Sequence, residues 1–213
     1  MKITKFVHSC LLIEMPAPVN RTVLFDPGIM SEEALQVNRL TYLDDICITH
    51  DHSDHVSISL LQRLIDKFPE ANLTAPASVL EVLRANGITK GEEKPPAGIT
   101  LFNSPHEQGE PLFSTPPQFG YHFLDVLSHP GDSHSFHETK RVLALPVTAP
   151  WGTTVRAVNI ALNLHPEYVV PIHDWHWSED ARHGMYESLE RIFGGAGIRF
   201  LKMETAQPVV INI

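Results

Sequence analysis

The chain has 213 residues, of which 43% are hydrophobic and 19% are charged. This composition predicts a single folded domain over residues 1–213 and excludes a chain made mostly of disordered charged segments. The formal net charge of -9 argues against nucleic acid and anionic membranes as partners, because long-range attraction to either one requires positive charge.

The first part of the sequence predicts a β-meander followed by helices. Short runs rich in β-branched and aromatic residues, separated by turn residues, predict strands at residues 2–7, 10–14, 22–25, 45–49 and 72–74. Apolar residues recur at helical spacing over residues 56–68, and Pro69 ends that pattern. A second helix is predicted over residues 77–86, where Gly87 follows as a left-handed C-terminal residue.

The rest of the sequence predicts an alternation of strands and helices. Residues 92–117 are rich in proline around one strand at residues 99–102, and a histidine in this segment favours an active-site loop over an interdomain linker. Further strands are predicted at residues 119–127, 142–146, 168–172, 199–203 and 209–213, with helices at residues 153–164 and 179–193. This alternation is typical of an α/β protein.

The cysteines and the lengths of the apolar runs indicate the cellular compartment in which the protein is expected. Cys10 and Cys47 each lie inside an apolar run and have no paired spacing, which predicts buried free thiols. The first residues lack the apolar core of a signal peptide, and no run approaches the ~20 apolar residues of a membrane span. We therefore expect a cytoplasmic protein without a membrane partner.

The sequence T-H-D-H-S-D-H at residues 49–55 carries the chemistry. Residues two apart in an extended segment point the same way, so His50 and His52 can bind one metal ion. Asp54 and His55 fall where the chain turns into the predicted helix, and they can address a second ion. Imidazole nitrogens and carboxylate oxygens bind zinc at ~2.0 to 2.2 Å, so the pattern predicts a zinc site.

A site with two ions needs further ligands, and three candidates follow predicted strands. These candidates are His106, Asp132 and His173. Each one alone can equally be a loop, turn or capping residue. Their shared placement at strand ends favours a common metal site.

These residues resemble the metallo-β-lactamase superfamily, whose signature T-H-x-H-x-D-H is unbroken at residues 49–55. Residues 1–4, 7–9 and 166–173 further resemble its small metal-dependent hydrolase branch, which includes L-ascorbate-6-phosphate lactonases. The resemblance covers nearly the whole chain. It implies an α/β protein with the αβ/βα four-layer sandwich fold and with the metal ions at one edge.

The resemblance also implies roles for individual residues. The first ion would be bound by His50, His52 and His106, the second by Asp54, His55 and His173, and both by Asp132. Asp26 would not bind metal itself but would accept a hydrogen bond from the imidazole of a metal ligand and so fix its tautomer. Asp54 and Asp132 would be catalytic, with Asp54 orienting water and carrying its proton. Two Zn2+ ions are expected because imidazole stands at position 52, where related diiron proteins carry glutamate, and Mn2+ or Fe stays open.

Side chains for a substrate pocket are harder to identify. We expect it to include His8, His134, Trp151 and His176. His8 occupies a position that the resemblance makes functional, whereas the other histidines can equally be solvated and the tryptophan can be part of a core. No role is assigned to His129, His134 or His137. Lys140, Arg141, Arg156 or Arg182 could supply a countercharge for an anionic substrate.

The leading hypothesis is a metal-dependent hydrolase. It would cleave a small ester, lactone or phosphodiester metabolite through a metal-bound hydroxide. The alternatives are an RNA- or DNA-processing nuclease of the same fold, which the negative charge disfavours, and a non-catalytic metal-binding protein. A diiron redox enzyme is weaker still, and the sequence leaves homo-oligomerisation open.

Overall fold

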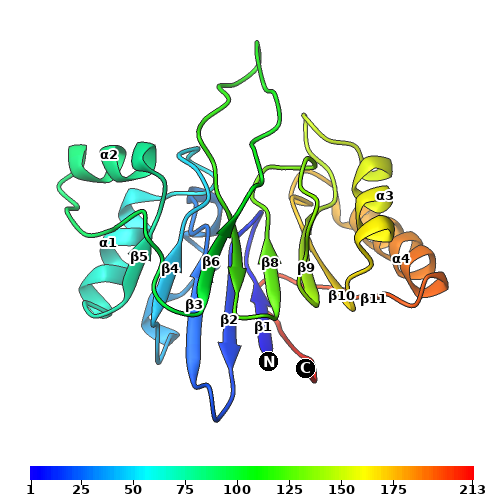
Figure 1. The fold of residues 1–213 in the computed structure, drawn as a ribbon, viewed down its shortest axis with the longest axis horizontal. Helices are drawn as coiled ribbons and strands as arrows, with labels where there is room; N and C mark the ends of the chain where they lie inside the picture. Colours follow the sequence, from blue (N-terminus) through cyan, green and yellow to red (C-terminus); the bar gives the residue numbers. More distant parts are fainter. The chain divides into compact units, whose positions relative to one another are not determined.

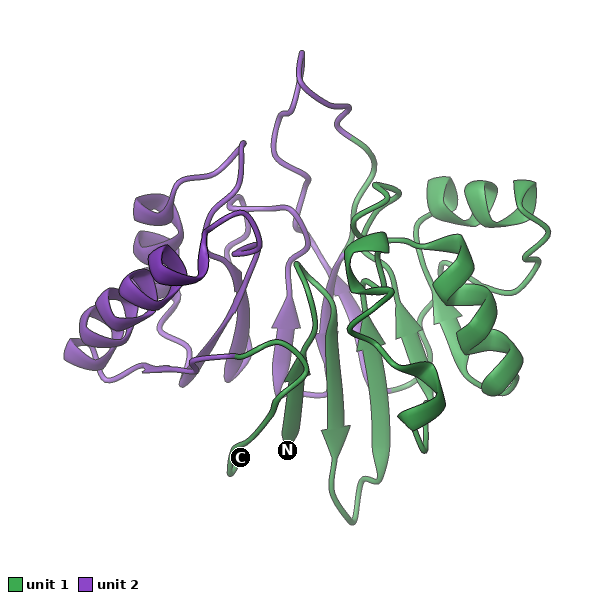
Figure 2. Ribbon diagram, turned by 180° about the vertical axis from the view of Figure 1, so that it is seen from behind, with its two compact units in different colours: residues 1–97, 116–119, 204–213 green, residues 98–115, 120–203 purple.

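The computed structural model describes residues 1–213 and contains two six-stranded sheets and four α-helices, which confirms the α/β class. The chain divides into two compact units, each with one sheet (Figure 2). Unit 1 comprises residues 1–97, 116–119 and 204–213, and unit 2 comprises residues 98–115 and 120–203.

Unit 1 is built on a sheet with the strand order β12-β1-β2-β3-β4-β5. Its strands are β1 (Lys2–Lys5), β2 (Leu11–Met15), β3 (Arg21–Phe25), β4 (Asp45–Cys47), β5 (Asn72–Thr74) and β12 (Pro208–Val210). Strands β1, β2 and β3 pair antiparallel, with Ile3 opposite Ile13, whereas β3, β4 and β5 pair parallel. The predicted meander is therefore present, and the end of the chain returns to pair with β1.

The helices of unit 1 bury one apolar face. They are the short 3-10 helices η1 (Ile29–Ser31) and η2 (Val37–Arg39) and the α-helices α1 (Ile58–Lys67) and α2 (Ala77–Ala85). Helix α1 begins where the Ser57 hydroxyl accepts the backbone N–H of Leu60 at 3.1 Å. Leu60, Leu61 and Leu64 are fully buried in one cluster with Ile46 of β4, and each buried leucine stabilises the fold by roughly 1.5 to 3 kcal/mol.

Unit 2 is built on a sheet with the strand order β11-β10-β9-β8-β7-β6. Its strands are β6 (Ile99–Phe102), β7 (Gly120–Phe123), β8 (Leu127–His129), β9 (Val142–Pro146), β10 (Tyr168–Ile172) and β11 (Arg199–Phe200). Helices α3 (Thr154–Leu164) and α4 (Glu179–Gly195) pack on this sheet through Ala157, Ala161, Leu189 and Phe193. Every residue of β9 and β10 is buried, as expected for parallel strands covered by helices.

The one long strand predicted at residues 119–127 is wrong. The chain turns after Phe123, where Leu124 has a left-handed φ of 51°, and it returns as β8 antiparallel to β7. Asp125 lies at this turn and pairs with Lys140 at 2.9 Å. The closing strands are also shorter than predicted, whereas the strands at residues 72–74, 99–102, 142–146 and 168–172 have the predicted bounds.

Within each sheet, the strands that precede the predicted site residues run in the same direction, as the arrows in Figure 1 show. In unit 1, β1, β3 and β4 run in the same direction, so His8, Asp26 and the loop at residues 49–55 all leave the same edge. In unit 2, β6, β8 and β10 run in the same direction, so His106, Asp132 and His173 leave the same edge. The sheet topology therefore gathers residues that lie far apart in the sequence.

Two further sequence predictions concern the cysteines and the membrane. Cys10 and Cys47 are buried free thiols, as predicted, and burial raises the pKa of the Cys47 thiol well above its usual value. None of the helices combines the length and the apolar character that crossing a membrane requires.

His122 on β7 is a buried titratable group away from the ligand edge. Its ring stacks on Phe102 with centroids 4.2 Å apart, and its Nδ1 lies 2.9 Å from the Ser128 hydroxyl. Burial lowers its pKa below 6.5, although Glu138, whose carboxylate lies 3.5 Å from Nε2, opposes this shift.

The lowered pKa of His122 makes stability depend on pH. Because the unfolded chain binds this proton more readily, the free energy of unfolding should fall as the pH drops from about 7 to about 5. We expect His122→Gln to reduce this pH dependence of the free energy of unfolding, as measured in urea titrations at several pH values. The prediction would be contradicted if the free energy of unfolding depended on pH equally in the wild type and in His122→Gln.

Candidate metal centre

Asp26 organises the start of the histidine loop, which we define as residues 49–55. It directly follows β3, is fully buried and has a left-handed φ of 46°. Its carboxylate accepts hydrogen bonds from the backbone N–H of Thr49 at 2.8 Å and from the Thr49 hydroxyl at 2.9 Å. A carboxylate at this depth requires such partners, so Asp26 fixes the point at which the loop begins.

The same carboxylate also contacts the far end of the histidine loop. Nδ1 of His55 lies 2.8 Å from Oδ2 of Asp26, and both side chains are fully buried. A carboxylate that holds one ring nitrogen of a histidine leaves the opposite nitrogen, here Nε2, to bind a metal ion. This is the contact that the resemblance implies for Asp26, and it makes His55 suitable as a ligand.

A glycine sets the path of the loop at Asp54. A Cβ atom added to Gly28 would lie 1.8 Å from the carbonyl oxygen of Asp54, where no side chain fits. The backbone N–H of Ile29 donates to the carbonyl of Ser53 at 2.9 Å, which holds the two segments together. Only glycine permits this close approach of the backbone, and the approach fixes the position of Asp54.

His50 and His52 converge as their spacing predicts. Nε2 of His50 and Nδ1 of His52 lie 3.1 Å apart, and the two rings meet edge to face. Two nitrogens bound at ~2.0 to 2.1 Å to one tetrahedral zinc ion lie roughly 3.3 Å apart. The donor set and this spacing therefore fit a shared metal ion.

His8 lies in the same cluster of side chains, beside Asp54 and His55. It is 2% exposed, and its backbone is left-handed with a φ of 65°. The Ser31 hydroxyl holds this turn by contacting both the N–H and the C=O of Val7 at 3.1 and 3.0 Å. Nε2 of His8 lies 3.1 Å from Oδ2 of Asp54, and its ring lies 5.0 Å from that of His55.

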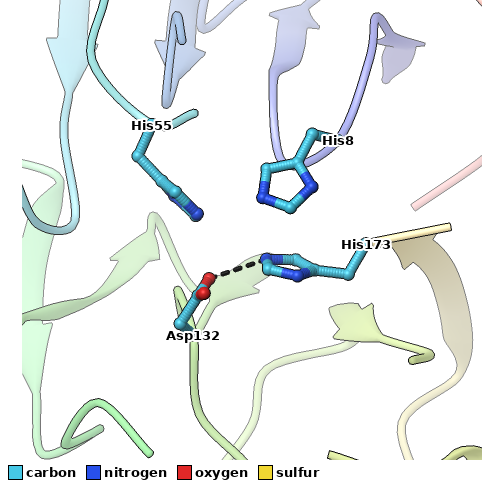
Figure 3. Close-up of side chains that lie close together, drawn as sticks. All are labelled: His8, His55, Asp132 and His173. Atoms are coloured by element: carbon cyan, nitrogen blue, oxygen red, sulfur yellow. Dashed lines mark ion pairs between the residues drawn. The ribbon is translucent and has the colours of Figure 1, made fainter. Parts of the chain in front are cut away.

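In unit 2, the predicted ligands His106 and His173 both lie beside a third, Asp132. Oδ1 of Asp132 lies 2.6 Å from Nε2 of His173, an ion pair drawn in Figure 3. Oδ2 lies 3.8 Å from Nε2 of His106. Nδ1 of His106 lies 2.6 Å from the carbonyl oxygen of Glu107, so the opposite nitrogen faces Asp132. His106 thus has the arrangement of a metal ligand, with one ring nitrogen held by a carbonyl group.

Glu107 connects the two loops that carry His106 and Asp132. Its backbone N–H donates to the carbonyl of Asp132, and its carboxylate accepts hydrogen bonds from the N–H of His134 and the hydroxyl of Ser135. Both terminal nitrogens of Arg156 on α3 lie 3.1 Å from this carboxylate. Burial opposes ionisation of Glu107, but these hydrogen bonds and the Arg156 charge together lower its pKa.

Two histidines without a clear role in the sequence have defined contacts. His134 is buried, its Nε2 lies 2.7 Å from the carbonyl of Pro146, and burial lowers its pKa. His129 is fully buried, and its Nδ1 accepts the backbone N–H of Gly131 at 3.3 Å, just before Asp132. Both histidines support the Asp132 loop, and neither lies in an exposed loop.

The other predicted pocket residues differ in exposure. Trp151 is half-buried, and its indole nitrogen donates to Oδ2 of Asp132 at 3.0 Å. His176 is exposed and lies 3.4 Å from the Thr148 hydroxyl, and partial burial lowers its pKa. His137 is exposed. Their place in a substrate pocket stays a prediction.

The His and Asp side chains that could hold a metal ion form two groups. In unit 1 these side chains are His8, His50, His52 and His55, and in unit 2 they are His106, Asp132 and His173. All predicted ligands except Asp54 belong to these groups, and His8 was predicted only as a pocket residue. The signal that could have identified His8 is its position three residues after the end of β1, a strand that runs in the same direction as β3.

Known proteins resemble this chain over most of its length. A family model described as a beta-lactamase superfamily domain matches residues 2–173. Protein Rv0786c of Mycobacterium tuberculosis is 34% identical over 198 residues, which cover 87% of this chain and 89% of that protein. The metallo hydrolase Igni18 of Ignicoccus hospitalis has a TM-score of 0.71 at 20% identity, covering 100% of this chain and 98% of that one. An isothiocyanate hydrolase from Delia radicum gut bacteria has a TM-score of 0.61 at 12% identity, covering 99% of both chains.

Removing Arg156 should weaken metal binding without removing a ligand. We expect Arg156→Ala to release the Glu107 carboxylate, loosen the loops of His106 and Asp132, and lower metal affinity by ~10 to 100-fold. Competition with a chromophoric chelator measures this affinity. The control is Arg141→Ala, which breaks the similar two-bond pair with Glu167 at 2.6 and 2.9 Å. Equal affinities for the two variants would contradict the expectation.

Proposed function

We propose that this chain, which belongs to the beta-lactamase superfamily and shares its fold with the metallo hydrolase Igni18, uses two zinc ions to hydrolyse a small ester or lactone. The single observation that carries this proposal is the histidine loop held at both ends by Asp26. Histidines and carboxylates on short, fixed loops are the donors that hydrolytic zinc centres use.

The proposed ligand assignment follows the family order of the residues. The first ion would be held by His50, His52 and His106, the second by Asp54, His55 and His173, and both by Asp132. The outer contacts of His55 with Asp26 and of His106 with the Glu107 carbonyl support this assignment, because each one commits Nδ1 and leaves Nε2 for metal. The predominance of imidazole favours zinc over manganese, which prefers oxygen ligands.

Asp54 and Asp132 have different proposed roles in the reaction. Bound zinc ions would polarise the scissile group and lower the pKa of water. The side chain of Asp54 is 30% exposed, so it can orient an attacking water molecule, accept its proton and pass it to the leaving oxygen. Asp132 is almost fully buried and lies against His173, so its role is to hold the centre together.

The pairing of basic side chains favours a neutral substrate. Arg156 binds Glu107, Arg141 binds Glu167, and Lys140 binds Asp125, so these three cations are each engaged by a carboxylate of unit 2. A phosphodiester carries a negative charge that an available cationic side chain would stabilise, whereas an ester or lactone carries no such charge. This pairing supports an ester or lactone over a phosphodiester, and with the net charge of -9 it disfavours a nuclease.

Metal content is the direct test of the centre. We expect about two equivalents of zinc per chain in protein purified without chelator, and about one in His52→Ala. Elemental analysis measures both values, with the exposed His137→Ala as the matched control. Dialysis against a chelator should abolish hydrolysis, and zinc should restore it. A chain that binds no metal after resupply would overturn the proposal.

Asp54 should matter more for turnover than for substrate binding. We expect Asp54→Asn to lower kcat by ~10² to 10⁴-fold while KM changes little, because the amide cannot accept the proton of water. A panel of lactones, carboxylic esters and phosphodiesters, assayed with wild type and variant, measures both parameters. Wild-type kcat in Asp54→Asn, with its zinc content preserved, would exclude Asp54 as the proton carrier.

A further inference from the structure

Trp151 directs a hydrogen-bond donor at the carboxylate proposed to hold both ions. It lies in the turn between β9 and α3, where Ala149 and Gly152 exchange backbone hydrogen bonds of 2.9 and 3.1 Å. This tight turn places Pro150 and Trp151 at its tip. The indole Nε1 then donates to Oδ2 of Asp132 at 3.0 Å, across 19 positions of the sequence.

The indole ring is held in place by the histidines of unit 2. Its centroid lies 5.1 Å from that of His134, 5.5 Å from that of His173 and 6.5 Å from that of His106. His134 is itself anchored by the carbonyl of Pro146. A Cβ atom at Gly152 would lie 2.7 Å from the His134 ring, so the glycine lets this histidine pack against the turn. The direction of the indole N–H is therefore determined by packing.

The chemistry of an indole N–H suits a positioning role. It donates one hydrogen bond, accepts none and does not bind metal. Oδ1 of Asp132 lies 2.6 Å from Nε2 of His173, so each carboxylate oxygen has a defined neighbour, and the plane of the carboxylate is fixed. Because a carboxylate oxygen has two lone pairs, the indole takes one from Oδ2 and leaves the other for a metal ion.

We propose that Trp151 is a positioning residue that fixes the Asp132 carboxylate for metal binding through its indole N–H. This inference rests on the proposed function, since it takes Asp132 as a metal ligand. This role differs from stacking on a substrate. If Trp151 positions Asp132, loss of the indole N–H alone should lower the metal affinity, whereas stacking requires only the ring. We expect Trp151→Phe, which keeps an aromatic ring, to raise the zinc dissociation constant by ~10 to 100-fold.

The chain supplies its own matched controls, because it has three tryptophans. Trp175 is 48% exposed, and Trp177 packs against the apolar cluster of α3 and α4. We expect Trp175→Phe and Trp177→Phe to bind zinc with wild-type affinity in competition with a chromophoric chelator. A merely structural tryptophan would change thermal stability and leave zinc affinity unaltered.

A second readout needs neither bound metal nor a folded Trp151→Phe variant. The 1H–15N indole signal of Trp151 can be assigned by elimination from the spectra of Trp175→Phe and Trp177→Phe. In the metal-free protein, Asp132→Ala should move this signal upfield, because the N–H loses a charged acceptor. The indole signals of Trp175 and Trp177 should stay in place.

The outcomes separate this inference from the proposed function. If the wild type and Trp151→Phe bind zinc with equal affinity, the proposed role of Trp151 is wrong, but the proposed metal centre is not contradicted. An indole signal that does not respond to Asp132→Ala would also overturn it. A wild type that binds no zinc would overturn the proposed function, and this inference with it. Weaker zinc binding by Trp151→Phe, together with an upfield shift of the Trp151 indole signal in Asp132→Ala, would support the proposal.

Discussion

The arrangement of the candidate centre in unit 1 depends on one buried carboxylate. Asp26 receives the backbone N–H and the hydroxyl of Thr49 and also contacts Nδ1 of His55. Burying this charge is unfavourable unless its oxygens are satisfied, so the chain must bring both ends of the histidine loop to it. Once both ends are fixed, the intervening residues have little freedom, and His50 and His52 meet at 3.1 Å. A single aspartate thus converts a flexible polar segment into a defined set of donors.

Much of this centre can be predicted from the sequence because its information is local. The two-residue spacing of His50 and His52 fixes their common direction, and the strand before them is recognisable from its apolar residues. His173 was identified for a similar reason, since it follows β10, whose bounds are as predicted. The α/β class also follows from local patterns, because strands and helices alternate with distinct periodicities.

The features that could not be predicted depend on contacts between distant residues of common types. Arg156 and Glu107 lie 49 positions apart, and neither the arginine nor the glutamate belongs to a motif. The same holds for Trp151 with Asp132, and for His8, whose place becomes evident only when the sheet sets β1 parallel to β3. The turn at Leu124 was missed because a leucine rarely adopts a left-handed backbone, so its sequence resembles a continuing strand.

Backbone strain shows why these contacts are needed. His8, Asp26 and His173 each come soon after a strand and each have a positive φ, of 65°, 46° and 62°, which costs a residue with a Cβ roughly 1 to 2 kcal/mol. Glycine would avoid this cost but would supply no ligand or carboxylate. The strained conformation redirects the chain immediately after the strand, so that the side chain stays at the sheet edge. It persists because hydrogen bonds hold it in place, from Ser31 beside His8 and from Thr49 on Asp26. The strained backbone therefore occurs at His8, Asp26 and His173, where the proposed site needs an imidazole or a carboxylate that glycine cannot supply.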